Sequence, residues 1–127
     1  MKILLDTCEF LWLVSGDVRL SPELIAELRD PKNELFLSVV SVWEIFVKHG
    51  IGKLTLPQAP GIFVRQQREA HKIVSLELNE AAVNELHTLP DLHRDPFDRM
   101  LICQAKAHGL SLASSDALVR QYSVALL

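Results

Sequence analysis

Short apolar segments alternate with longer mixed segments along the whole chain. Residues 2–5 form an apolar run that ends at Asp6, and a short apolar run bounded by polar residues is typical of a strand buried on both faces. Runs of the same kind predict three further strands and a possible edge strand at the end of the chain. These segments are residues 35–40, 73–76, 110–113 and 124–127.

Helices are expected in the segments between these strands. The clearest starts are Ser21-Pro22 and Asp95-Pro96, where a capping side chain precedes a proline at the first helical position. Gly109 can end the second of these helices after residue 107. The remaining expected helices cover residues 7–14, 41–49, 62–70 and 79–87, with a last short one starting at Asp116.

Residues 41–49 are the helix in which one candidate acid falls. Ser41 and Glu44 have the spacing of a capping box, which places Glu44 in the first turn. The apolar spacing leaves two possible buried faces. One contains Val42, Phe46 and His49, and the other contains Trp43, Val47 and Gly50. Trp12, in the densely apolar helix 7–14, is expected in the core.

Strands separated by helices predict an α/β fold. We expect a three-layer α/β/α architecture with a central parallel sheet of four to five strands. At 127 residues, the chain fits a single domain spanning residues 1–127. In parallel sheets of this kind, ligands bind beyond the carboxyl ends of the strands. Candidate chemistry is therefore expected at that edge.

Four acids are predicted to meet at this edge, namely Asp6, Glu44, Asp98 and Asp116. Each also stands where helix starts favour acids, so helix capping explains any one of them taken singly. Four carboxylates in one place would repel one another unless a dication neutralised them. An all-oxygen ligand set selects a hard ion such as Mg²⁺ or Mn²⁺. Spacing alone leaves both interpretations open.

Four sequence blocks carry a resemblance to a known family. Residues 4–7 (LLDT), 41–45 (SVWEI), 93–102 (HRDPFDRMLI) and 112–116 (LASSD) resemble, in order and spacing, the acidic blocks of PIN domains. The similarity covers nearly the whole chain and is nearest to bacterial PIN proteins grouped with VapC-type toxins. It implies a PIN-like fold and a metal-dependent endoribonuclease that hydrolyses RNA with Mg²⁺ or Mn²⁺.

The resemblance assigns roles to individual residues. It places Asp6, Glu44, Asp98 and Asp116 at the four acidic positions, as catalytic residues and metal ligands. In the third block, Asp98 heads the stretch that matches the family helix, whereas Asp95 is better explained as its cap and a supporting acid. Thr7 and Ser114, the latter standing where the family often has threonine, are expected to orient carboxylates or water. Whether one or two ions bind is left open.

The resemblance to toxins also implies partners. We expect a cognate antitoxin whose arginine- or lysine-bearing segment enters the acidic cleft, and a homodimer formed through apolar helix faces. The RNA that is cut stays undetermined. Two rival functions are a non-catalytic PIN-like interaction module and a phosphatase with Asp6 as its nucleophile. Such phosphatases usually carry a second aspartate two positions on, where this chain has Cys8.

Charge and composition adjust this picture. A formal net charge of −3 argues weakly against a nucleic-acid partner, although bound dications would reverse the local field. Arg99 is the preferred candidate for gripping substrate among the scattered cations, which also include Lys48, Lys53, Arg94 and Arg120.

The spacing of the cysteines and histidines predicts no metal-binding or catalytic role for them. The two cysteines, Cys8 and Cys103, match no metal spacing and are expected to pack in helices, and the five histidines are expected at the surface or at helix ends. No apolar run has the roughly 20 residues of a membrane-spanning helix, and no secretion signal is evident, so a cytoplasmic location is expected.

Overall fold

The computed structural model describes residues 1–122 and 124–127. Four described strands form a parallel sheet in the order β3-β2-β1-β4. The strands are β1 (Lys2–Leu5), β2 (Glu34–Ser38), β3 (Val74–Leu76) and β4 (Ser111–Ala113). Ile3 aligns with Leu35 on β2 and with Ser111 on β4, so β1 is paired on both sides.

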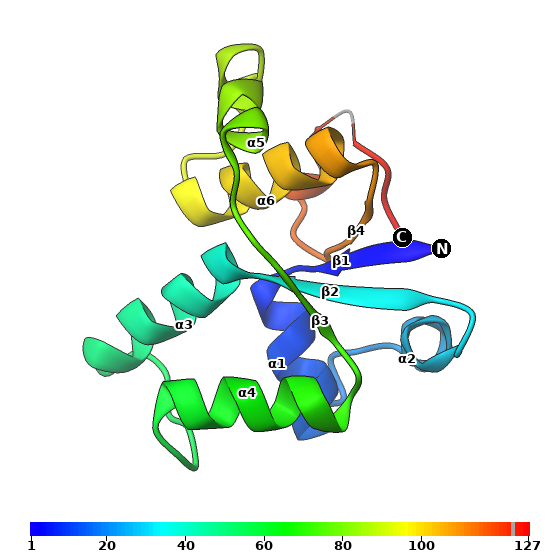
Figure 1. Ribbon diagram of the computed structural model, residues 1–127, viewed down its shortest axis with the longest axis vertical. Coiled ribbons are helices and arrows are strands. Elements are labelled where there is room, and N and C mark those ends of the chain that lie inside the picture. The colour runs from blue at the N-terminus through cyan, green and yellow to red at the C-terminus, as the bar shows by residue number, and fades with distance from the viewer. Residues whose placement is uncertain (123) are drawn as a thin grey trace.

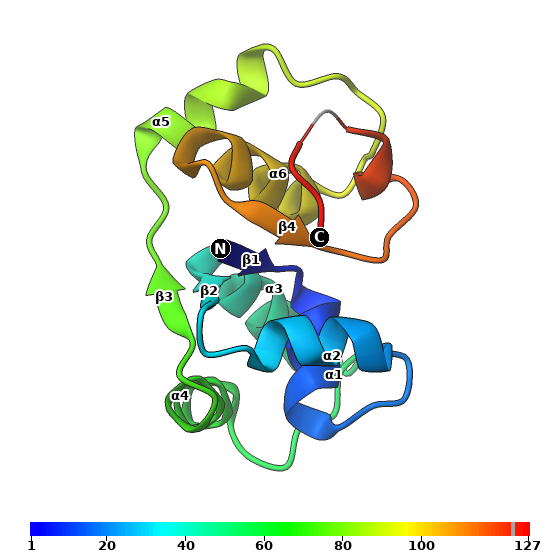
Figure 2. The same ribbon diagram turned by 90° about the vertical axis from the view of Figure 1, so that its right-hand side faces the viewer.

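Helices cover both faces of this sheet. Figures 1 and 2 show α1, α2 and α4 on one side of the strands and α6 on the other. The expected three-layer α/β/α fold is therefore confirmed. The helices are α1 (Thr7–Ser15), α2 (Pro22–Arg29), α3 (Val39–Gly50), α4 (Pro60–Ala70), α5 (Glu80–Asn84) and α6 (Pro96–His108), with 3-10 turns η1 (Glu85–His87) and η2 (Val119–Gln121).

Alternating strand residues supply the two halves of the core. Ile3 and Leu5 pack with residues of α1, α2 and α4, whereas Leu4 between them packs with residues of α6. All three are fully buried. Side chains of a strand point alternately to the two faces, so covering both faces requires apolar residues at consecutive positions. This explains why β1 has no polar face.

The start of α3 differs from the prediction. The strand expected to reach residue 40 ends at Ser38, whose side chain accepts a hydrogen bond from the backbone N–H of Val40 and caps the helix. The predicted capping box at Ser41 is therefore wrong, and Glu44 lies in the second turn instead of the first. The β-branched pair Val39-Val40 favours a strand by propensity, but the Ser38 cap redirects the chain.

The buried face of α3 also differs from both predicted faces. Ser41, Glu44 and Ile45 are buried, while Trp43 and Phe46 are 60% and 47% exposed. Two of the four buried residues of α3, which also include Val40, are polar, and apolar spacing cannot identify a polar face that turns inward. This rotation carries Glu44 into the interior.

The end of the chain does not form the expected fifth strand. Leu126 makes an isolated parallel bridge to Leu112 on β4. The backbone N–H of Leu112 donates to Ala125 at 2.8 Å, and that of Leu127 donates back to Leu112 at 3.0 Å. The tail thus covers the outer edge of β4 through a few hydrogen bonds.

Two expected helices are shorter than predicted. The helix expected over residues 79–87 is divided into α5 and η1, and the one expected at Asp116 is a turn that leads into η2.

None of the described helices has the length and apolar character needed to cross a membrane.

The strand order places a crevice at the carboxyl ends of β1 and β4. From β1 the sheet continues through β2 and β3 on one side and through β4 on the other. Loops after neighbouring strands that lead to opposite sides leave a gap between them, and ligands of open α/β sheets bind in such gaps. Asp6 follows β1, and its backbone N–H donates to Ala113 at the end of β4.

Candidate metal centre

An acidic cleft of about 270 Å³ lies at the carboxyl ends of β1 and β4. Six of its described lining residues are acids, and Lys48 is the one cation among them. The lining residues are Asp6, Cys8, Glu9, Trp12, Glu44, Lys48, Asp95, Asp98, Ser115 and Asp116. All four acids predicted as ligands are therefore brought together.

Asp6 occupies the buried floor of the cleft. It is 6% exposed and sits at the N-cap position of α1, yet its side chain caps neither of the usual helix N–H groups. Instead the hydroxyl of Ser114 donates to its Oδ2 at 2.7 Å. Burial raises the pKa of Asp6 to about 7, and the Glu9 carboxylate adds to this rise while the Ser114 bond opposes it. Helix capping does not explain this residue.

Asp95 and Asp98 divide two tasks at the start of α6. The Asp95 side chain accepts hydrogen bonds from the backbone N–H groups of Phe97 at 2.9 Å and Asp98 at 3.4 Å, which confirms the predicted cap. Asp98 is free of that task and points into the cleft. Burial, followed by the charges of Asp6 and Asp95, raises the pKa of Asp98 to about 7.

The carboxylates of Asp98 and Asp116 both lie close to the ring of His93. Nε2 of His93 lies 2.9 Å from Oδ2 of Asp98 and 3.4 Å from Oδ2 of Asp116, although neither oxygen is aligned for a regular hydrogen bond. The other oxygen of Asp116 caps the turn before η2 by accepting from the N–H groups of Leu118 and Val119. Asp116 is thus held from two sides.

His93 is a neighbour of the carboxylates and not a metal ligand in this arrangement. The three facing atoms of His93, Asp98 and Asp116 lie within 4.8 Å of one another, a spacing that an ion could bridge. However, the backbone N–H of Asp95 donates to Nδ1 of His93 at 3.2 Å, so the proton of the neutral ring lies on Nε2. Nε2 therefore presents an N–H group to Asp98 and Asp116, and not the lone pair that a metal ligand needs.

Glu44 reaches the cleft from α3. Thr7 donates its hydroxyl to Oε1 of Glu44 at 2.7 Å, and the Ser41 hydroxyl lies 2.9 Å from that of Thr7. Lys48, one helical turn further on, forms an ion pair with Oε2. The structure thus places the hydroxyls of Thr7 and Ser114 on cleft carboxylates, as the sequence predicted.

The donor set fits a hard dication. The cleft offers carboxylate oxygens, which Mg²⁺ and Mn²⁺ prefer, and the single lining cation is already paired with Glu44. The raised pKa values of Asp6 and Asp98 show that ionising both is unfavourable without further positive charge. A divalent cation would supply that charge.

The family model of the PIN domain matches residues 3–124. This chain belongs to the PIN domain family. A comparison with curated proteins finds no match. The family match spans the same four blocks from which the acids of this PIN domain were predicted, and it includes every acid that lines the cleft.

Solved structures share the fold of this PIN domain at low sequence identity. It resembles VapBC2 from Rickettsia felis bound to a promoter DNA fragment, with a TM-score of 0.74 at 12% identity, covering 100% of this chain and 97% of that one. For VapBC-1 of nontypeable Haemophilus influenzae the TM-score is 0.62 at 20% identity, with 95% and 91% covered. For FitAcB of Neisseria gonorrhoeae it is 0.55 at 21% identity, with 98% and 96% covered.

Arg99 is placed away from the cleft. Its guanidinium donates to the carbonyl of Pro90 at 3.1 Å and to the hydroxyl of Tyr122 at 3.3 Å. That hydroxyl in turn accepts from the N–H groups of Leu92 and His93. Arg99 therefore holds the loop before α6 and is not among the residues that line the cleft, and its contact with substrate stays a prediction.

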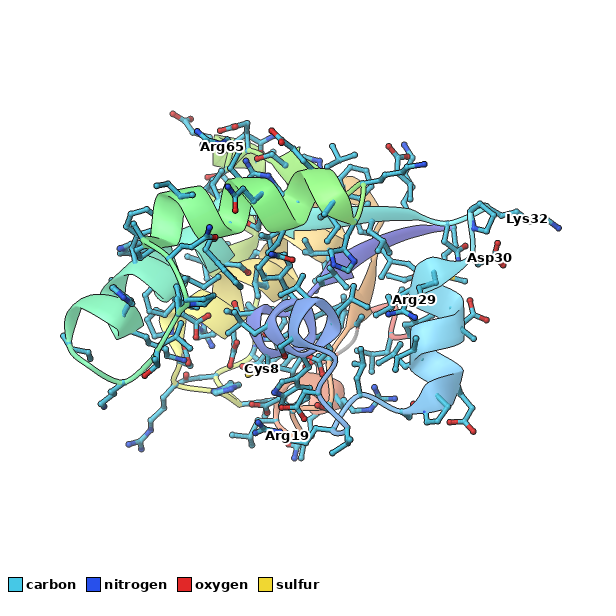
Figure 3. All side chains as sticks on the ribbon, turned by 90° about the horizontal axis from the view of Figure 1, so that it is seen from below. Cys8, Arg19, Arg29, Asp30, Lys32 and Arg65 are labelled. Atoms are coloured by element: carbon cyan, nitrogen blue, oxygen red, sulfur yellow. The ribbon has the colours of Figure 1, made fainter. Side chains whose placement is uncertain are left out.

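Cys8 and Trp12 line the cleft instead of being buried in the core. Cys8 is exposed, contrary to the expectation that it packs in its helix, and Figure 3 shows it on α1. Desolvation of its thiol and the charges of Asp6 and Glu9 raise the pKa of Cys8 to about 11, so the thiol stays neutral. Trp12 is only partly buried and packs at the edge of the core.

Sequence reasoning missed two residues of the site. Glu9 was not singled out, although a lone acid three residues after Asp6 in an apolar helix lies on the same helical side. His93 was expected at the surface or at a helix end, but its side chain is 11% exposed and contacts two site acids. No periodicity could place His93, because it lies in an irregular loop.

The raised carboxyl pKa values predict an unusual pH dependence of stability. The pKa values of Asp6 and Asp98 are about 7 in the folded chain, above the ordinary aspartate value of 3.8. Both carboxyl groups therefore bind protons more tightly when the chain is folded. Their contribution to stability is complete below the ordinary value and is lost as the pH rises through about 7. In chelator, we expect the melting temperature to fall between about pH 5 and about pH 8, and Asp6→Asn to show a smaller fall. Identical pH profiles for the two proteins would contradict this assignment.

Proposed function

We propose that this PIN domain is a metal-dependent endoribonuclease and acts as the toxin of a toxin–antitoxin pair. The observation that carries the proposal is the convergence of Asp6, Glu44, Asp98 and Asp116 in one cleft. These are the acids that the resemblance to VapC-type toxins assigns to the family positions. Three of them do not cap a helix or turn, which removes the simpler explanation for their presence.

The side chains of the cleft have separable tasks in this proposal. A bound Mg²⁺ or Mn²⁺ would lower the pKa of a water molecule and stabilise negative charge on the phosphate. Asp6 and Asp98 would hold the cation, since burial and neighbouring carboxylates raise the pKa of both to about 7 and a cation would favour their charged forms. Ser114 and Thr7 fix the orientation of Asp6 and Glu44 through hydrogen bonds of 2.7 Å.

An aromatic side chain at the cleft supports an RNA strand as the proposed substrate. Trp12 lines the cleft, and the guanidinium of Arg19 lies 5.0 Å from the centre of its ring. An aromatic ring beside a cation is the usual platform for an unpaired base above a charged backbone. Figure 3 shows two further cations, Arg29 and Lys32, at the C-terminal end of α2 with Asp30 between them. Binding of the RNA backbone near the cleft would therefore depend on few basic residues and on the bound metal ion.

Removal of single acids should abolish RNA cleavage without unfolding the chain. We expect Asp98→Asn and Asp6→Asn to cut tRNA and mRNA at least about 100-fold more slowly than wild type, because loss of a ligand removes several kcal/mol of charge stabilisation. Cleavage is measured on gels with Mg²⁺, Mn²⁺ or chelator. Glu69→Gln, an exposed acid at the end of α4, is the matched control and should cleave normally.

The same assay can reject the proposal. Because each cleft variant removes a charge from a crowded acidic site, its melting temperature in chelator should not fall below that of wild type. Equal cleavage by wild type and Asp98→Asn would contradict the nuclease. So would wild-type protein that cuts no RNA with either metal. The non-catalytic interaction module would then be favoured.

A cognate antitoxin is the proposed protein partner. The three solved relatives above were crystallised as VapBC and FitAcB assemblies, which supports a partnered toxin. In this chain, six acids surround a cleft with one lining cation, so a basic segment would be attracted to it. Such a segment would place an arginine or lysine where the metal binds and would block the site.

Co-expression with the short reading frame that neighbours the gene tests this partner. The two products are expected to copurify as one complex that no longer cleaves RNA. Replacing arginines and lysines of the partner's cleft-binding segment with glutamine should restore cleavage. A neighbouring product that leaves cleavage unchanged, or the lack of such a reading frame, would favour a solitary nuclease.

A homodimer is proposed through α3. Trp43, Phe46, Val47 and Ile51 are exposed apolar residues of or next to this helix, and Ile62 on α4 is also exposed. Burying such a cluster against a second copy of itself would remove apolar surface from water on both chains. We define these five residues as the α3 patch.

A charge placed in the α3 patch should separate the two copies. Phe46→Lys is expected to be monomeric by light scattering at concentrations where the wild type is a dimer, because it would bury an unpaired charge at the interface. Val18→Lys is the control, since Val18 is 95% exposed and lies outside the patch. A monomeric wild type, or a Phe46→Lys variant that stays dimeric, would rule out this interface.

A further inference from the structure

Glu9 is a charged residue buried in an apolar helix. It is 1% exposed, one of the lowest values for any acid of the described chain, and it lines the cleft beside Asp6. One carboxylate oxygen, Oε1, accepts hydrogen bonds from the backbone N–H of Ser115 at 2.9 Å and from its hydroxyl at 2.7 Å. The contact holds the loop after β4 against α1.

The second oxygen of Glu9 has no such explanation. Among the residues that the structure describes, Oε2 is buried and has no hydrogen-bond partner. A buried carboxylate oxygen without a partner destabilises a fold, and burial accordingly raises the pKa of Glu9. An amide side chain could accept the Ser115 bonds equally well without the buried charge. A purely structural role therefore does not require an acid at this position.

The surroundings of Oε2 indicate what it would bind. Glu9 lies between two acids of the metal centre, because it begins one turn after Asp6 and contacts the residue before Asp116. The one cation that lines the cleft, Lys48, is paired with Glu44 on the opposite wall. An unpaired hard oxygen next to two aspartates is a ligand environment for a divalent cation.

We propose that Glu9 is a fifth carboxylate of the centre, and that its Oε2 binds a divalent cation together with Asp6 and Asp116. This inference rests on the proposed metal-dependent function but adds a ligand that the four family positions do not include. It also gives the centre a second group of ligands, on the α1 and β4 side, besides that formed by Asp98 and Glu44 on the α6 and α3 side.

Metal binding by Glu9→Gln tests the inference directly. Gln keeps an oxygen that can accept the Ser115 bonds and replaces the unpaired carboxylate oxygen with an amide. Mn²⁺ affinity is measured by titration calorimetry and by the electron paramagnetic resonance signal of free Mn²⁺. We expect Glu9→Gln to bind Mn²⁺ at least about tenfold more weakly than wild type. In chelator its melting temperature should equal or exceed that of wild type.

Controls separate this inference from the proposed function. Glu69→Gln removes an exposed acid and should bind Mn²⁺ as wild type does, whereas Asp98→Asn should bind it more weakly. Glu9→Met, which keeps the side-chain length without an oxygen ligand for a hard cation, replaces the Gln variant if the latter fails to fold. Wild-type protein that binds no Mn²⁺ would overturn both the function and the inference.

Two results would overturn the inference alone. One is wild-type affinity for Mn²⁺ in the folded Glu9 variant, which would leave the nuclease with its four acids. The other is a Glu9→Gln protein that melts well below wild type in chelator and regains full Mn²⁺ affinity at lower temperature. That result would assign Glu9 to holding the Ser115 loop.

Discussion

Repulsion among buried carboxylates is the constraint on which the organisation of this protein depends. The parallel sheet delivers acids to the ends of β1 and β4, and the helices that follow bring more to the same place. Burial and mutual charge raise the pKa of both Asp6 and Asp98 to about 7, so near neutral pH the cleft stores unfavourable electrostatic energy. A bound cation would convert that cost into binding affinity. The arrangement of the acids therefore lowers the stability of the metal-free protein.

The surrounding structure holds these carboxylates in place with hydroxyl groups, which carry no charge of their own. Ser114 holds Asp6, Thr7 holds Glu44, and Ser115 holds Glu9, each through a hydrogen bond of 2.7 Å. A neutral donor can orient a carboxylate without neutralising it, which leaves the negative charge available to a cation. Lysine or arginine at these positions would compete with the metal. Among the described acids that line the cleft, only Glu44 has a lysine or arginine partner.

The loop before α6 shows how residues outside the cleft support it. Arg99 and Tyr122 bind backbone groups of this loop, and the loop presents His93 to Asp98 and Asp116. Arg99 thus supports the site through its contacts with the loop. Its cation is used inside the protein, which is consistent with an acidic chain that would rely on bound metal to attract a nucleic acid.

Local patterns in the sequence were enough for the elements and for the edge of the sheet that carries the chemistry. Apolar runs predicted β1 to β4, and Asp95-Pro96 predicted both the start of α6 and the separation of a capping acid from Asp98. These features depend on residues within a few positions of one another, so periodicity and capping rules capture them. The parallel direction of the strands also followed from the alternation of strands and helices.

Contacts between distant residues were decided only by the tertiary structure. The inward rotation of α3 buried Glu44 and exposed Trp43, because Thr7, 37 positions away, hydrogen-bonds that carboxylate. Glu9 is fixed at the cleft by the loop after β4, which brings Ser115 to it across 106 positions. Burial, pairing and pKa depend on such distant neighbours, and local patterns carry no record of them. The sequence by itself thus determined where acids would gather, and the fold decided which of their oxygens are left for a metal.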